Sequence, residues 1–195
     1  PYRKMGQAGS PVSDVHLEDC RVPAAHIIGG REGVGFQTVM KVLNKQRLHL
    51  AALCTGPAIR MLDLTLAHTS QRKQFGQPIG AFQAIKHQLA SCAVAIEFAK
   101  PVVWQAAQAL QDERETASVH VSHAKVAATD AAMLTAETAI QVHGAMGYTY
   151  EVDLHFWMKR SWALAGAWGT RAFHLKRVDE AVLGGTLQNC AGGTT

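Results

Sequence analysis

The sequence predicts an all-α fold: an antiparallel up-down helical bundle of four to five helices, with a short β remnant at the N-terminus. Two observations support this prediction. Apolar residues recur at alternating spacings of three and four over two long segments, as in helices that pack nearly antiparallel at shallow angles. Strand signals, in contrast, are confined to the first residues of the chain and vanish from Phe36 onward.

The N-terminal residues 1–27 differ from everything that follows them. Val15 and Leu17 lie in a short alternating pattern, which the sequence EDCRVPA ends, so we expect a strand and an exit loop. The next sequence, IIGGREGVG, resembles a loose phosphate-binding loop. It lacks the lysine and the βαβ pattern of such loops, and we therefore interpret it as a linker.

Helical spacing then dominates the chain. The predicted helices are, in order, about 35–70, 82–110, 119–140, a fourth that begins near Asp153 and a fifth that follows Gly169 and ends at Leu183. The residues 185–195 have the composition of a flexible tail.

Composition and charge narrow the class of protein. The 195 residues are 48% hydrophobic, which is enough for one globular domain. The net charge of +4 comes from scattered basic residues, so nucleic acid is not an expected partner. We find neither a secretory leader nor an uncharged apolar run of about 20 residues, so no membrane span is expected. The chain opens on Pro1, which suggests a fragment or a processed product.

The sequence offers no metal site and no nucleophile that could be assigned with a reason. Four widely separated cysteines suit reduced thiols in a cytoplasmic protein better than zinc ligands or disulfides. Di-iron bundles use Glu-x-x-His pairs, and none occurs here. His120 and His123 share a helix face without a carboxylate in matching spacing. The sequence also has no GxSxG motif.

Three short sequences between the predicted helices contain more cations, aromatic residues, prolines and glycines than a helix connection requires. QRKQFGQPIG (71–80) joins two helices with two cations, an aromatic residue, a proline and two glycines. QVHGAMGY (141–148) ends the third helix, and AGAWGT (165–170) precedes the last one. Taken singly, the second would be an ordinary glycine C-cap and the third a turn.

Taken together, these sequences carry the order RxxFGxxI, QxxGxxGY and GT, which resembles the C-terminal domain of the acyl-CoA dehydrogenase family. The opening sequence KMGQAGSPVSDVHLEDCRVPA resembles the end of that family's middle β-domain. The resemblance therefore divides the chain into the end of the middle β-domain with a linker (1–27), the helical bundle domain (28–184) and the tail (185–195). It implies an FAD-dependent enzyme that oxidises an acyl-CoA thioester to the 2,3-enoyl-CoA.

The resemblance also assigns FAD-binding residues. Arg72 and Phe75 look like the pair that reaches the FAD of a neighbouring subunit, and Ile79 completes their motif. An arginine fork suits the pyrophosphate, and an aromatic ring offers a flat surface to the adenine end. Gln141 and Gly144 look like a second contact with the same half of the cofactor.

Thr170 looks like a hydroxyl and amide donor to FAD, placed at a helix N-terminus. Two departures from the family concern the site. Ala145 stands where a second adjacent glycine is usual. Most members carry the catalytic base directly before GT, where this chain has Trp168, and a minority carry it where this chain has Gln46. Neither side chain can accept the proton, so the resemblance implies a base from elsewhere.

The leading hypothesis is an acyl-CoA dehydrogenase subunit or C-terminal fragment without its own base. The sequence GYTYEVDLHFWMKR resembles family members that work as mixed assemblies of two different subunits. The alternatives are a non-catalytic partner subunit that completes a neighbour's FAD site, a flavin-dependent monooxygenase of the same fold, and a plain helical interaction module. Expected partners are an acyl-CoA, further subunits in a homo- or hetero-oligomer arranged as a dimer of dimers, and an electron-transfer flavoprotein as acceptor.

Overall fold

A computed structural model describes residues 1–184, and the predicted tail at 185–195 lies outside the described residues. Five helices make up the bundle, as the periodicity predicts. Their bounds are α1 (Gly35–Gln71), α2 (Gln83–Gln111), α3 (Ala117–His143), α4 (Leu154–Gly166) and α5 (Arg171–Leu183). Each lies within a few residues of its predicted range, and the all-α bundle is confirmed.

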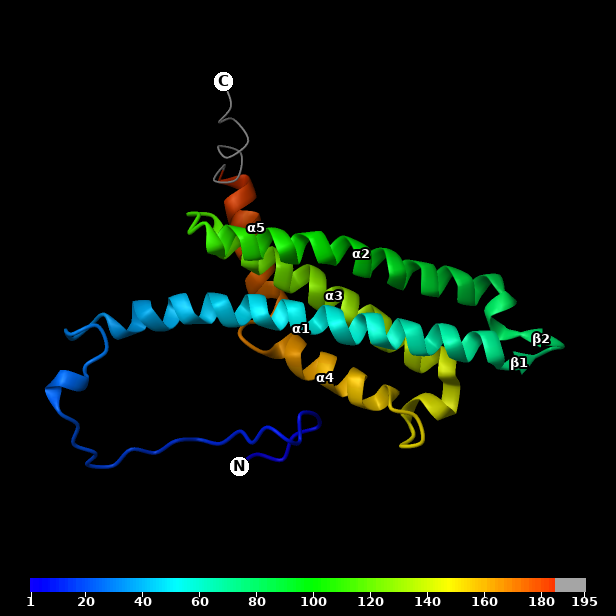
Figure 1. Ribbon diagram of the computed structural model, residues 1–195, viewed down its shortest axis with the longest axis horizontal. Helices are drawn as coiled ribbons and strands as arrows, with labels where there is room; N and C mark the ends of the chain where they lie inside the picture. The colour runs from blue at the N-terminus through cyan, green and yellow to red at the C-terminus, as the bar shows by residue number, and fades with distance from the viewer. Residues whose placement is uncertain (185–195) are drawn as a thin grey trace, which may run out of the picture.

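The three longest helices lie side by side, and the two shorter ones flank them (Figure 1). α3 is the central helix, because it packs against α1, α2, α4 and α5. Alanines make this possible: Ala124, Ala128 and Ala132 of α3 have no exposed surface. Small side chains let helix backbones approach one another closely, so a helix that touches four others is built largely from them.

The connections between helices are short. β1 (Lys73–Gln74) and β2 (Gln77–Pro78) form a small hairpin between α1 and α2, followed by a 3₁₀ turn at Ile79–Ala81. A second 3₁₀ turn, Gly144–Tyr148, follows α3. The hairpin and this second turn lie at the same end of the bundle (Figure 1).

The N-terminal segment runs along the bundle as an extended chain with one 3₁₀ turn at Ala24–His26. Its extended form agrees with the expectation, but the predicted strand does not form. Val15 and Leu17 are exposed, and the two strands among residues 1–184 are those of the 73–78 hairpin. A strand needs a partner strand for its backbone hydrogen bonds, and residues 1–184 provide none for this segment.

α1 is the one helix in the described part of the chain that is long and apolar enough, by length and composition, to cross a membrane. Core helices of bundles share these properties, and Leu50, Ala51 and Cys54 of α1 are packed in the bundle core with α2 and α3. The absence of a membrane span stays a prediction.

Candidate functional site

The connection between α1 and α2 is a tight hairpin. Lys73 pairs with Pro78 and Gln74 with Gln77, which leaves Phe75 and Gly76 as the two-residue turn. Both turn residues have positive φ, 53° and 80°, as in the primed turns that fit the twist of a hairpin. The amide of Ile79 donates to the carbonyl of Arg72 at 2.8 Å and closes the loop.

Phe75 stands at the tip of this hairpin with 91% of its surface exposed. Within the described chain its ring meets the ring of Phe82 edge-on, with centroids 6.1 Å apart. A non-glycine residue in the left-handed region costs roughly 1–2 kcal/mol, and an exposed aromatic ring recovers none of it by burial. The hairpin therefore presents an apolar side chain outward at a cost to the stability of this chain.

Five of the six residues predicted to bind the cofactor line one open pocket of about 380 Å³. They are Arg72, Phe75, Ile79, Gln141 and Gly144. The first three come from the α1–α2 connection, and the other two from the end of α3. The structure thus brings together two motifs that lie about 60 positions apart in the sequence.

Gly144 ends α3 in a conformation that favours glycine. Its φ of 63° and ψ of −139° are avoided by residues with a Cβ, although a Cβ here would meet nothing within 4 Å. Gly147 is required for the opposite reason, since its Cβ would lie 2.9 Å from the carbonyl oxygen of Ile140. The two glycines fold the chain back at the pocket.

Two histidines of the same pocket escape the sequence reasoning. His68 and His143 stack with ring centroids 4.2 Å apart and an interplanar angle of 22°. His143 Nδ1 lies 2.7 Å from the carbonyl oxygen of Ala139. Burial, followed by the charges of His143 and Arg72, lowers the pKa of His68. Their positions, one turn before Arg72 and directly before Gly144, are the signals that could have identified them.

The two positions where the resemblance predicts a base, Gln46 and Trp168, are connected through Arg47 at the other end of the bundle. Arg47 Nε donates to the carbonyl oxygen of Trp168 at 2.9 Å, and Gln46 directly precedes Arg47. Trp168 has a φ of 57°, and its side chain is 51% exposed. It lines a largely apolar pocket of about 580 Å³ together with Leu50, Leu164 and residues of the N-terminal segment.

Thr170 lies in the same turn as Trp168 and not in the hairpin pocket. It is the N-cap of α5, and its hydroxyl oxygen accepts from the amide of Phe173 at 3.3 Å. From Arg47 to Arg72 the helix advances 25 positions, which places the two sites roughly 35–40 Å apart along α1. The predicted FAD residues are therefore divided between two separate sites of the chain.

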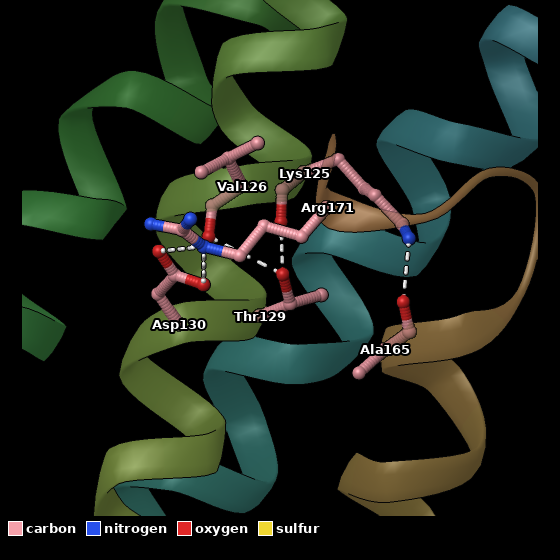
Figure 2. A network of polar contacts seen from close by, with 6 residues as sticks. All are labelled: Lys125, Val126, Thr129, Asp130, Ala165 and Arg171. Carbon is pink, nitrogen blue, oxygen red and sulfur yellow. Dashed lines mark hydrogen bonds and ion pairs between the residues drawn. The ribbon is translucent and has the colours of Figure 1, made fainter. Parts of the chain in front are cut away.

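Beneath the Trp168 turn lies a buried polar cluster that the sequence did not reveal. Lys125 is 1% exposed, and its Nζ donates to the carbonyl oxygen of Ala165 at 2.7 Å (Figure 2) and to that of Gly169 at 2.5 Å. His174 Nδ1 lies 3.1 Å from the hydroxyl of Ser122. Burial, and next the charge of Lys125, lowers the pKa of His174 to about 4. Burial also lowers the pKa of Lys125, and the two carbonyl oxygens are the partners of its ammonium group.

The carboxylates of the segment before α4 do not replace the missing base. Glu151 and Asp153 precede α4, whereas Trp168 follows it. A helix of 13 residues separates them by roughly 20 Å. Among the residues that the structure describes, no group of three His, Cys, Asp or Glu side chains could hold a metal ion.

Comparison with known proteins agrees with this architecture. Residues 33–183 match the family described as "Acyl-CoA dehydrogenase, C-terminal domain". A probable acyl-CoA dehydrogenase of Bacillus subtilis, YngJ, is 42% identical over 151 residues, which are 77% of this chain and 39% of the relative. A cyclohex-1-ene-1-carbonyl-CoA dehydrogenase of Geobacter metallireducens is 38% identical over 76% of this chain and 39% of its own. The chain thus spans about two fifths of these curated relatives.

A solved structure shows the same fold. A glutaryl-coenzyme A dehydrogenase in complex with glutaryl-CoA superposes with a TM-score of 0.86, at 29% identity, over 94% of this chain and 46% of that chain. A further similar structure, the ChsE4-ChsE5 complex of Mycobacterium tuberculosis, gives a TM-score of 0.68 at 26% identity over 72% of this chain and 38% of that one. The family match, the sequence identity and the shared bundle lead to one conclusion: this chain belongs to the acyl-CoA dehydrogenase family.

Proposed function

We propose that this chain is part of an FAD-dependent dehydrogenase that oxidises an acyl-CoA thioester to the 2,3-enoyl-CoA, with a base from outside this chain. The separation of the hairpin pocket from Thr170 is the observation that supports it most. The two sites are farther apart than the ends of one extended FAD molecule, so one chain cannot offer both to the same cofactor. Two chains side by side can, if the hairpin of one meets the turn of the other.

The hairpin pocket suits the diphosphate and adenine half of FAD. The Arg72 side chain is exposed and makes no ion pair with any acidic residue among residues 1–184. Its guanidinium can therefore donate two charged hydrogen bonds to a diphosphate. The exposed ring of Phe75 offers a flat apolar surface to adenine. Because the hairpin is already folded, little conformational entropy is lost on binding.

The Trp168 turn suits the substrate side of the site. The hydroxyl oxygen of Thr170 accepts one hydrogen bond, which leaves its hydrogen free to donate to the cofactor. The backbone amide of Trp168 can donate to a thioester carbonyl whatever the side chain. The pocket beside it, with Leu50 and Leu164, is apolar enough for an acyl chain. Bound FAD would supply the acceptor for the hydride that leaves the acyl β-carbon.

The proton of the α-carbon needs a base that neither Trp168 nor Gln46 provides. An indole and an amide do not accept a proton at neutral pH, and a well-placed base contributes about 10²–10⁴-fold to the rate. We infer that a second subunit supplies this base. The assembly is then a homo- or hetero-oligomer, arranged as a dimer of dimers, with an electron-transfer flavoprotein as the electron acceptor.

A second candidate function follows from Trp168 and Gln46, the two residues that cannot act as a base. If this chain only completes a neighbour's FAD pocket, it is a non-catalytic partner subunit, and Trp168 closes its own substrate site. The similarity to the ChsE4-ChsE5 complex, which has two named components, supports a mixed assembly of this kind.

The test is purification of the complete native assembly, followed by anaerobic addition of acyl-CoA thioesters. We expect bound flavin whose absorbance bleaches, together with formation of the enoyl-CoA. Bleaching that requires a paralogous chain with the usual glutamate would favour the partner subunit. Oxygen insertion into the product would favour a monooxygenase. An assembly without flavin would refute the proposed function.

A further inference from the structure

We propose that Lys125 is a positioning residue, which fixes the turn at residues 165–170 and thereby places Trp168 and Thr170. Lysine is seldom fully buried unless it is paired, because removal of an ammonium group from water is unfavourable. Lys125 is buried in the middle of α3 and forms no ion pair in the described chain. Its partners are two carbonyl oxygens of a single turn, and these compensate the buried charge.

The two carbonyls that Lys125 binds lie on either side of Trp168 in the sequence. Ala165, shown with its bond to Lys125 in Figure 2, lies in the last turn of α4. Gly169 lies directly before Thr170. Carbonyls at the end of a helix have no partner within that helix, and a cation stabilises them. The ammonium group of Lys125 therefore links the end of α4 and the segment before α5 to α3.

Two further contacts confine the same turn. Arg47 Nε donates to the carbonyl of Trp168, which lies between the two carbonyls that Lys125 binds. Arg171, the first residue of α5, pairs with Asp130 of α3, with Nε 2.9 Å from both carboxylate oxygens. Asp130 lies just over one helical turn beyond Lys125, so α3 holds the turn from two points (Figure 2).

This arrangement orients the peptide groups of the turn. In a planar trans peptide, the carbonyl and the following N–H point in opposite directions. Because the carbonyls of Trp168 and Gly169 face the buried donors, the amides of Gly169 and Thr170 face away from them. Neither amide has a hydrogen-bond acceptor within residues 1–184. Lys125 thus keeps two N–H donors directed outward, beside the side chain of Thr170.

Turn conformations of this kind need external support. Trp168 and Gly169 have φ values of 57° and 120°, and a Cβ at Gly169 would lie 2.7 Å from His174 Nε2. A side chain at positive φ persists only where its surroundings enforce it. Arg47 binds the carbonyl oxygen of Trp168 itself, with His174 Nε2 3.3 Å from the same oxygen, and Lys125 binds the carbonyl of Gly169, the next residue. These contacts enforce the conformation of Trp168.

Hydrogen exchange of the chain, read by mass spectrometry, tests the proposal. Lys125→Met keeps the length and removes the donors, so peptides that cover 165–174 should exchange about 10–100-fold faster, with α2 unchanged. Lys41→Met, at an exposed position of α1, is the control and should change neither region. If Lys125→Met does not fold, Lys125→Gln, which keeps an N–H donor, should give a smaller increase in the same peptides.

A fluorescence readout separates positioning from general packing. Emission and acrylamide quenching should change in Lys125→Met, and this change should disappear when Trp168→Phe is added. Equal acceleration of exchange in α2 and in 165–174, or an unaltered turn, would overturn the proposal. Neither measurement requires FAD, so failure of the proposed function would leave this test intact. Loss of FAD from the Lys125→Met assembly is the consequence that rests on that function.

Discussion

Arg47 and Trp168 are joined by a hydrogen bond from Nε to the backbone carbonyl oxygen, at 2.9 Å. The guanidinium of Arg47 also lies 5.3 Å from the centre of the Phe173 ring. The contact links α1 to the turn between α4 and α5. Trp168, and Gln46 next to Arg47, are the two positions where the family resemblance predicts the base, and this one hydrogen bond connects their segments.

A carboxylate at position 168 should restore proton abstraction at the substrate site that Trp168 lines, measured without the subunit proposed to supply the base. Because Trp168 already has positive φ, Trp168→Glu adds no new type of backbone strain. We expect dehydrogenation of an acyl-CoA to rise by about 10²–10⁴-fold if the base is the missing element. Gln46→Glu tests the other position. Trp104→Glu, an exposed site on α2, should have no effect, and equal activity of all three variants would contradict the idea.

Removal of the Arg72 guanidinium should weaken FAD binding without unfolding the bundle. A charged hydrogen bond contributes about 1.5–3 kcal/mol, so Arg72→Ala should raise the dissociation constant roughly 10–100-fold in the complete assembly. Arg60→Ala removes an exposed arginine of the same helix and serves as the control. Titration of the apo-assembly with FAD measures both. Unchanged affinity in Arg72→Ala would mean that Arg72 is only a solvated cation.

Phe75 should reveal a conflict between stability and function. Asn-Gly is the preferred two-residue sequence for a turn with two positive φ angles, so Phe75→Asn should stabilise the chain by a few tenths to about 1 kcal/mol. The same change removes the surface proposed for adenine and should lower FAD retention. Urea unfolding and flavin content give the two readouts. A variant that gained stability and kept its flavin would show that the ring has no role in binding.

The two glycines Gly144 and Gly56 should respond to alanine with opposite signs. Gly144→Ala places a Cβ at a φ of 63°, and we expect a loss of roughly 1–3 kcal/mol. Gly56 lies inside α1, and a Cβ there meets nothing within 4 Å. Gly56→Ala should therefore add about 0.5–1 kcal/mol of stability. Denaturant unfolding of both variants is sufficient, and a shared sign would disprove the conformational explanation.

The pKa of His174 predicts how stability depends on pH. Burial lowers this pKa from 6.5 to about 4, so the unfolded state binds more protons than the folded state between these values. Stability should therefore be complete above pH 6.5 and fall as the pH drops toward 4, by at most about 1.4 kcal/mol per unit from this group. The lowered pKa values of His68 and His120 act in the same direction.

His174→Gln should flatten that pH dependence, whatever its effect on absolute stability. His16→Gln, in the exposed N-terminal segment, should leave the slope unchanged. Unfolding free energies at intervals between pH 4 and 7.5 provide the comparison. An unaltered slope in His174→Gln would show that the imidazole is not the group that titrates.

The helices were predictable because their signals are local. The three-four spacing of α2 and α3, and the glycines near their ends, depend on neighbouring residues in the sequence. The grouping of Arg72 and Gln141 in one pocket follows from the family motifs, which predict that both contact one cofactor. What local patterns could not show was the positive φ of Phe75, which depends on strand pairing across the turn.

Contacts between distant segments were also beyond the sequence. The stack of His68 on His143 depends on where two helices end relative to each other. The burial of Lys125 is similar: a lysine within an apolar helix normally reaches solvent, and the two carbonyls that retain it are 40 and 44 positions away. The prediction of a strand in residues 1–27 is wrong because an alternating pattern reports only on the segment itself. It does not show whether a second strand is present to pair with it.

The length of α1 between Arg47 and Arg72 also limits how this protein can change. Each residue of a helix turns the chain by about 100°, so 25 positions amount to nearly seven whole turns. Deletion of a single residue between these two arginines would rotate the hairpin by about 100° and shift it by about 1.5 Å relative to the Trp168 turn. A substitution in this stretch leaves that spacing unchanged, whereas a change of length would displace the hairpin pocket and the Trp168 turn relative to each other.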